Sequence, residues 1–126
     1  MKADLRLLLV DDEPNMLATL QDILEEFGWH VDSATSGEEA LALLHQVNAD
    51  AVLMDFKMPG LSGVEVAEMM VHERPQLAIF LMSADVSESW RARAMQCGVR
   101  AVLSKPLDIS SAINLLIEHQ KQGIGL

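Results

Sequence analysis

The residues best suited to chemistry in this sequence are carboxylates, a serine hydroxyl and a lysine, each of which follows an apolar run. The first run leads into Asp11 and Asp12, and later runs lead into Asp55, Ser83 and Lys105. Carboxylate oxygens are preferred ligands of Mg²⁺ or Mn²⁺, and lysine and serine side chains bind phosphoryl oxygens. If the fold gathers these residues, they predict a site for a divalent cation and a phosphoryl group.

Each of these residues also has an ordinary structural interpretation. Asp11 and Asp12 could cap the helix that follows them and interact with its dipole. Ser83 could cap the next helix, and Lys105 could be a solvated residue at a strand end. Clustering favours the functional interpretation, because neighbouring carboxylates repel one another and raise one another's pKa unless a cation intervenes.

Asp55 is the sharpest candidate for a nucleophile. The apolar segment 51–54 leads into it, and Pro59 and Gly60 turn the chain away behind it. A carboxylate can accept a phosphoryl group and form an aspartyl phosphate. The alternative roles for Asp55 are metal ligand only, or turn former.

The composition restricts the class of protein. The chain has 126 residues, of which 50% are hydrophobic and 22% charged, so we expect one compact domain. Its formal net charge of −10 argues against nucleic acid or an anionic membrane as a direct partner. The sequence has no signal-peptide pattern, no apolar stretch of roughly 18 residues and a single cysteine, so we expect a cytoplasmic protein.

Apolar runs alternate with amphipathic stretches along the chain. The apolar runs predict strands at 5–10, 30–34, 51–54, 77–82 and 99–103. The amphipathic stretches predict helices at 14–27, 37–47, 64–73, 86–96 and 109–120. Ser36 and Glu39 have the spacing of a capping box at the start of the second helix. The alternation predicts βαβ units, hence a parallel sheet with helices on both faces.

The expected fold is a doubly wound, flavodoxin-like α/β fold of the (βα)5 type. The second and fifth runs are the least hydrophobic and belong at the edges, which the strand order 2-1-3-4-5 satisfies. Ligands of such sheets bind outside the carboxyl ends of the strands, where the connections reverse direction. Asp11, Asp12 and Asp55 follow the two strands beside this point, so topology and chemistry predict the same site.

Four segments resemble the receiver domains of response regulators in two-component signalling. They are Val10–Pro14, Met54–Gly60, Met82–Ala84 and Ser104–Pro106. Each segment alone would be a weak signal, but their combination, order and intervals are specific. The resemblance covers about residues 5–121 and leaves 122–126 as a C-terminal tail or the start of a linker.

The resemblance implies a role for each residue of the site. Asp55 would accept a phosphoryl group from the phosphohistidine of a sensor histidine kinase or phosphotransfer protein. Asp12, Asp55 and the backbone carbonyl of Lys57 would bind Mg²⁺ directly, and Asp11 would contribute through water. Ser83 and Lys105 would bind the phosphoryl group.

The resemblance also implies how a switch would work, with one departure. The peptide bond before Pro106 would be cis, and movement of Ser83 would shift the helix at 86–96. In the family an aromatic residue on the fifth strand usually follows this movement. This sequence has Val102 there, which has no ring to reorient.

Four residues are candidate modulators of the switch. Trp90 could report or share the movement, although packing is its alternative role. Lys57 and Asp85, each two residues after a site residue, could face each other across the pocket and hinder attacking water. Their alternative role is that of solvated charges. Ala84 follows Ser83 in the same segment.

Three functions remain open from the sequence. The favoured one is a signalling switch that is not an enzyme, in which phosphorylation changes the surface of the fourth helix, fifth strand and fifth helix. That surface would control an output domain or downstream partner, or form a homodimer. The second is a Mg²⁺-dependent phosphohydrolase, which usually has an acidic residue where this chain has Lys57. The third is a receiver-like module that no longer accepts phosphoryl groups. The sequence names neither the kinase nor the signal, and it does not separate a stand-alone regulator from part of a longer protein.

Overall fold

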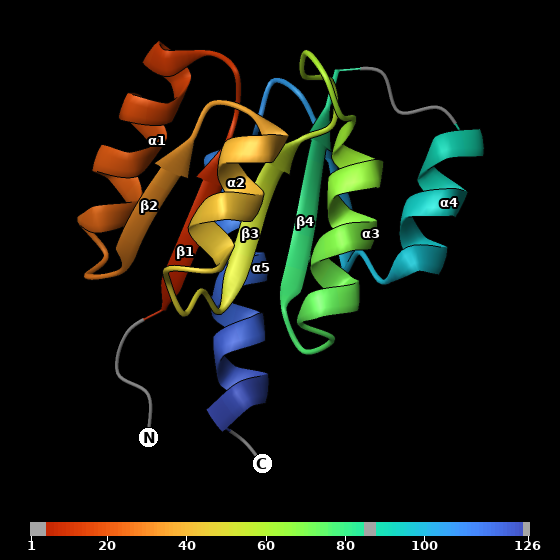
Figure 1. Ribbon diagram of the computed structural model, residues 1–126. Helices are drawn as coiled ribbons and strands as arrows, with labels where there is room; N and C mark the ends of the chain where they lie inside the picture. Colours follow the sequence, from red (N-terminus) through yellow and green to blue (C-terminus); the bar gives the residue numbers. More distant parts are fainter. Residues whose placement is uncertain (1–4, 85–87, 125–126) are drawn as a thin grey trace.

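A five-stranded parallel sheet forms the centre of the molecule (Figure 1). The computed structural model describes residues 5–84 and 88–124. The strands are β1 (Arg6–Val10), β2 (His30–Ala34), β3 (Ala51–Asp55), β4 (Ala78–Ser83) and β5 (Ala101–Ser104). They lie in the order β2-β1-β3-β4-β5, so the predicted doubly wound fold and strand order are confirmed.

Helices cover both faces of the sheet (Figure 1). They are α1 (Pro14–Glu25), α2 (Gly37–Leu44), α3 (Gly63–Glu73), α4 (Glu88–Cys97) and α5 (Ile109–Ile124). One core cluster joins the sheet to α2, α3 and α4, and a second joins it to α1 and α5. The two clusters exist because successive side chains of a strand point to opposite faces. On β1, for example, Leu8 belongs to the first cluster and Leu9 to the second.

The central strands are buried on both faces, as their continuous apolar runs predict. Every residue of β3 and β4 is buried, and in β1 only Arg6 is exposed. The edge strands β2 and β5 contain half-buried or exposed residues. Unequal hydrophobicity along the sequence therefore determines which strands lie inside the sheet.

Several element boundaries differ from the predicted ones. α1 ends at Glu25, and a turn leads to Gly28, whose φ of 85° lies in the left-handed region that glycine adopts readily. α5 continues to Ile124, beyond the predicted end at 120. The predicted start of the helix at 86 lies outside the described residues. The boundary between a receiver domain and a tail near 121 stays a prediction.

The capping contacts differ in part from the predicted pattern. Ser36 caps α2 and accepts a hydrogen bond from the backbone N–H of Glu39 at 3.1 Å, as predicted. The Glu39 carboxylate accepts from the N–H of Thr35 at 2.7 Å, so the expected return bond to Ser36 is replaced. A complete capping box occurs instead at α3, between Ser62 and Glu65. Within residues 5–84 and 88–124, no helix has both the length and the apolar character to span a bilayer.

Candidate functional site

Strand pairing brings the predicted site residues together at the carboxyl ends of the parallel strands, which we call the carboxyl edge of the sheet. β1 and β3 are neighbours in which Val10 pairs with Met54, so Asp11 and Asp55 come at matching positions. β4 and β5 pair Ser83 with Ser104, and the backbone N–H of Lys105 donates to the Ser83 carbonyl at 2.8 Å. Residues far apart in sequence therefore meet where the strands end.

Lys105 lies between two buried carboxylates. Its Nζ is 3.1 Å from Asp11 Oδ2 and 3.2 Å from Asp55 Oδ2. The Asp11 side chain is 1% exposed, that of Asp55 8% and that of Lys105 18%. Burying charge is costly unless opposite charges are paired. One ammonium between two carboxylates leaves an excess of negative charge, which a divalent cation would offset.

Burial shifts the pKa values of Asp55 and Lys105 in opposite directions, but both pKa values end above their ordinary values. Burial raises the pKa of Asp55, and the charge of Asp11 raises it further, whereas contacts with Lys105 and the Lys57 N–H lower it. Burial lowers the pKa of Lys105, but hydrogen bonds and charges from Asp11 and Asp55 outweigh this and raise it overall. Lys105 is therefore an ammonium near neutral pH. Ionised Asp55 needs further positive charge beside it.

The three aspartates fit a small oxygen-seeking cation. Each of Asp11, Asp12 and Asp55 offers a carboxylate oxygen, and these oxygens lie within 4.8 Å of one another. With metal–oxygen distances near 2.1 Å, two ligands of one octahedral Mg²⁺ ion lie about 3 to 4 Å apart. Small side-chain adjustments would close the cluster around the ion. Among the residues that the structure describes, no other cluster of this kind occurs.

Neither Asp11 nor Asp12 is the N-cap residue of α1, so the capping part of their structural alternative is not observed. The N-cap of α1 is Glu13, and no side chain bonds to the first turn there. One oxygen of Asp11 accepts from the Glu13 N–H at 3.0 Å, and the other faces Lys105. Asp12 is exposed. Its carboxylate is therefore accessible to a ligand at the rim of the site.

The other predicted residues surround this charged cluster. Ser83 is 3% exposed at the end of β4, and the Lys105–Pro106 peptide bond is cis, as the resemblance implied. The Lys57 N–H donates to Asp55 Oδ1 at 3.4 Å. A metal-binding role for the Lys57 carbonyl stays a prediction. Asp85 lies outside the described residues.

A cavity of about 210 Å³ opens beside the cluster. It is lined by Asp55, Phe56, Lys57, Ser83, Ala84, Trp90 and Lys105. The Phe56 and Trp90 rings stack in it, with centroids 4.0 Å apart and planes at 11°. The sequence predicts a role for Trp90 but no partner, and it indicates no role for Phe56 beyond its place in the segment Met54–Gly60. Val102 packs against the core cluster shared by the sheet, α2, α3 and α4, and it is not among the described residues that line the cavity.

Gly63 allows α3 to begin directly against the site. Its N–H donates to the Phe56 carbonyl at 2.8 Å. A Cβ at this position would lie 2.7 Å from Phe56 Cα and 2.9 Å from the Asp55 carbonyl oxygen. The absence of a side chain at Gly63 thus lets the helix hold the segment that carries Asp55.

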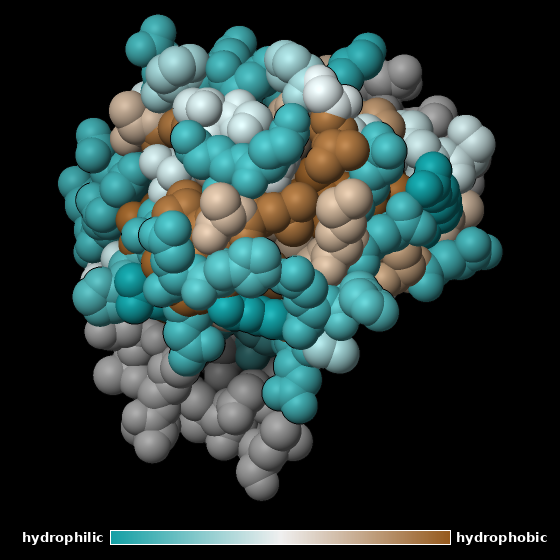
Figure 2. Space-filling view, in the orientation of Figure 1, coloured by the Kyte–Doolittle hydropathy of each residue, from teal (hydrophilic) through white to brown (hydrophobic). Residues whose placement is uncertain are grey.

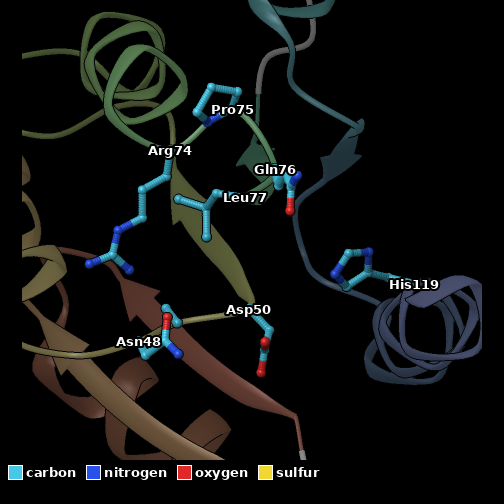
Figure 3. Close-up of a pocket in the computed structure, with 8 residues that line it drawn as sticks. Asn48, Asp50, Arg74, Pro75, Gln76, Leu77 and His119 are labelled. Atoms are coloured by element: carbon cyan, nitrogen blue, oxygen red, sulfur yellow. The ribbon is translucent and has the colours of Figure 1, made fainter. Parts of the chain in front are cut away.

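A larger cavity of about 470 Å³ lies at the amino ends of the strands, which we call the amino edge of the sheet (Figure 3). Its charged residues bind the main chain. The Arg74 guanidinium donates to the Val47 carbonyl at 3.0 Å and also to that of Leu44. The Asp50 carboxylate accepts from the Arg6 N–H at 2.9 Å. These hydrogen bonds give both charged side chains a structural role, because they satisfy main-chain groups near the end of α2 and at the start of β1.

Comparison with known families agrees with this geometry. A model of the family described as response regulator receiver domain matches residues 7–117. This chain belongs to that family. The receiver domain is 34% identical to a response regulator receiver protein of Anaeromyxobacter over 87% of this chain and 46% of that protein. It is 30% identical to the regulatory protein AtoC of Escherichia coli over 93% of this chain and 25% of AtoC. The chain thus spans less than half of each of these relatives.

Solved structures show the same fold. A CheY-like receiver domain protein from Methanospirillum hungatei superposes with a TM-score of 0.92 at 25% identity, covering 98% of this receiver domain and 100% of that chain. The response regulator TrrA from Thermotoga maritima, in complex with Mg²⁺-BeF, has a TM-score of 0.81 at 31% identity. That match covers 91% of this chain and 98% of TrrA.

Proposed function

We propose that this receiver domain is a phosphorylation-operated switch in which Asp55 accepts a phosphoryl group. The donor is the phosphohistidine of a sensor histidine kinase or phosphotransfer protein. The observation that carries the proposal is the position of Lys105 Nζ, within 3.2 Å of both Asp11 and Asp55 beside a cavity. Membership of the receiver family supports it.

The transfer is a substitution at phosphorus. A carboxylate oxygen of Asp55 forms the new O–P bond, the P–N bond to the donor imidazole breaks, and the departing electron pair stays on the imidazole nitrogen. Lys105 and Ser83 bind oxygens of the transferred group and hold it in line with Asp55. Asp11 holds the Lys105 ammonium in place for this contact.

The aspartate cluster provides for a metal ion in this reaction. Asp11, Asp12 and Asp55 would hold Mg²⁺, with the carbonyl oxygen of Lys57 as a further ligand. When bound, Mg²⁺ supplies positive charge that offsets the charge on the phosphoryl oxygens. TrrA, a related regulator, forms a complex with Mg²⁺-BeF, and this supports the assignment of Mg²⁺ to the present chain.

Phosphorylation would then change a surface away from Asp55. A phosphoryl group brings up to about two negative charges and strong acceptor oxygens. Ser83 moves toward these oxygens and shifts the chain that leads to α4. The altered α4, β5 and α5 surface acts on an output domain or downstream protein, or favours a homodimer. The domain thus acts as a signalling module, and loss of the phosphoryl group is slow.

Intact-mass measurement tests the proposal. After incubation with acetyl phosphate and Mg²⁺, the wild-type chain gains a labile adduct of about 80 Da. Asp55→Asn gains none. Asp50→Asn, which changes a carboxylate at the opposite edge, gains the adduct as the wild type does. An unmodified wild type, or an equal adduct on Asp55→Asn, contradicts the proposal. Many turnovers of a phosphate ester would favour a phosphohydrolase instead.

A further inference from the structure

Phe56 is the residue that connects the acceptor aspartate to α4. Its N–H donates to the Met82 carbonyl at 2.8 Å, and its carbonyl accepts from the Gly63 N–H at 2.8 Å. The backbone next to Asp55 is therefore held on both sides. The Phe56 ring then stacks on the Trp90 indole, with centroids 4.0 Å apart.

Trp90 is the principal anchor for the first half of α4. Among residues 89–97, only Ala94 is buried, and Trp90 and Cys97 are half-buried. α4 lies beside α3 at the outer side of the domain (Figure 1). With so few apolar anchors, the position of the first turn of α4 depends strongly on the Trp90 contact with Phe56.

The same two rings form one wall of the acceptor cavity. Asp55, Ser83 and Lys105 line it from the strand ends, and Trp90 is the lining residue that α4 contributes. Figure 2 shows apolar surface next to polar surface on the α2 and α3 face of the molecule. Because Trp90 lines the cavity beside Asp55, displacement of the indole would widen the cavity on the α4 side.

We propose that the Phe56–Trp90 stack is an aromatic wall that restricts the access of water to phosphorylated Asp55 and thereby sets the lifetime of the phosphoryl group. This inference rests on the proposed function. In the reaction concerned, a water oxygen forms a bond to phosphorus and the bond from phosphorus to the Asp55 oxygen breaks. The products are inorganic phosphate and the free carboxylate, and the protons of water go to phosphate and solvent.

The wall acts by position. An aromatic stack favours the closed arrangement over an open one, and the free energy of such a pair corresponds to a factor of about 2 to 10 in population. Water reaches phosphorus from the open arrangement, so the hydrolysis rate scales with that population. Val102 has no ring that could replace the wall from β5.

Decay of the adduct tests the wall. The 126-residue chain is phosphorylated with acetyl phosphate and Mg²⁺, the donor is removed, and the adduct is followed over time by intact mass. Trp90→Leu should decay about 2-fold to 10-fold faster than the wild type, since it keeps apolar bulk but loses the stack. Trp90→Phe retains a ring and should decay within about 2-fold of the wild type. The matched control, Met95→Leu, changes an exposed residue of the same helix and should leave the rate unchanged.

A double-mutant cycle separates the wall from general destabilisation. Phe56→Leu should accelerate decay as Trp90→Leu does, and the double variant should be no faster than either single variant, because both remove one contact. Thermal unfolding is measured in parallel for every variant. If Trp90→Leu does not fold, Phe56→Leu and Trp90→Phe decide the question.

The outcomes separate the wall from the proposed function. A wild type that gains no adduct overturns the proposed function and the wall with it. A wild type that gains the adduct, with decay rates equal in Trp90→Leu and Phe56→Leu, overturns the wall alone. Additive accelerations, or a Trp90→Phe variant as fast as Trp90→Leu, would also overturn it.

Discussion

The two edges of the sheet each hold a partly buried cation, and the two cations have different partners. At the amino edge, Arg74 donates to the carbonyls of Val47 and Leu44, which are neutral groups of the main chain. At the carboxyl edge, Lys105 contacts the carboxylates of Asp11 and Asp55. The larger cavity lies at the amino edge and the smaller at the carboxyl edge.

This difference shows why cavity size does not identify the site. Arg74 donates hydrogen bonds to carbonyls at and just after the end of α2, so its charge has a structural role. Lys105 joins side chains that carry more negative charge than it can neutralise, and an uncompensated cluster of this kind is typical of a ligand site. We therefore expect substitutions at the carboxyl edge to change the rate of phosphorylation, and substitutions at the amino edge to change the free energy of unfolding.

The largest effect is expected at Lys105. Lys105→Met should slow phosphorylation of Asp55 by roughly 100-fold, because it removes a preorganised charge that stabilises the transferring group. The growth rate of the mass adduct at saturating Mg²⁺ measures this. Arg74→Met is the matched variant at the amino edge and should keep a rate within about 2-fold of the wild type. A wild-type rate in Lys105→Met would remove the contrast.

Arg74 should show the converse behaviour. Arg74→Met should lower the free energy of unfolding by about 2 kcal/mol, because two carbonyls near the end of α2 lose their donor. Denaturant unfolding measures this. Arg93→Met provides the control, since Arg93 pairs with Glu68 on the exposed surface and such pairs contribute about 0 to 1 kcal/mol. Equal losses in the two variants would mean that Arg74 is an ordinary surface residue.

Mg²⁺ bound at the carboxyl edge should stabilise the folded domain. Above the dissociation constant, each tenfold rise in Mg²⁺ concentration should raise the free energy of unfolding of the wild type by about 1.4 kcal/mol. Asp12→Asn should weaken this response, because it removes a ligand, whereas Asp50→Asn should keep it. Thermal unfolding over a Mg²⁺ series measures both. An unchanged response in Asp12→Asn would exclude Asp12 as a ligand.

The smallest expected effect is a pH dependence in metal-free protein. Folding raises the pKa of Asp55 above its ordinary value of 3.8, chiefly through burial. The folded state thus disfavours the ionised form, and stability is lost as pH rises from 3.8 through the raised pKa. Asp55→Asn should therefore be more stable than the wild type at pH 7 and lose this advantage near pH 3. Parallel unfolding curves in a chelator test the sign, and a destabilised Asp55→Asn at pH 7 contradicts it.

The sequence predicted the fold well because hydrophobicity differs between strands. The continuous apolar runs became the buried β1, β3 and β4, and the more polar runs became the edges. That order alone placed Asp11 beside Asp55. The gathering of the site thus followed from topology, without knowledge of any side-chain contact.

Contacts between distant side chains could not be predicted in this way. Helical periodicity places Trp90 on α4 but does not say which residue it contacts, so it does not predict the stack on Phe56. The Arg74 contacts span 27 and 30 residues and have no local signal. The sequence does not predict the extension of α5 past residue 120, because Gly123 weakens the helical pattern.

The most direct measurement locates the phosphoryl group on the chain. Borohydride reduces an acyl phosphate to an alcohol, so a phosphorylated aspartate is recovered as homoserine in peptides sequenced by mass spectrometry. After incubation with acetyl phosphate and Mg²⁺, we expect homoserine at position 55, and none when Mg²⁺ is chelated. Homoserine at Asp11, Asp12 or Asp50 in place of Asp55, or at no aspartate, would contradict it.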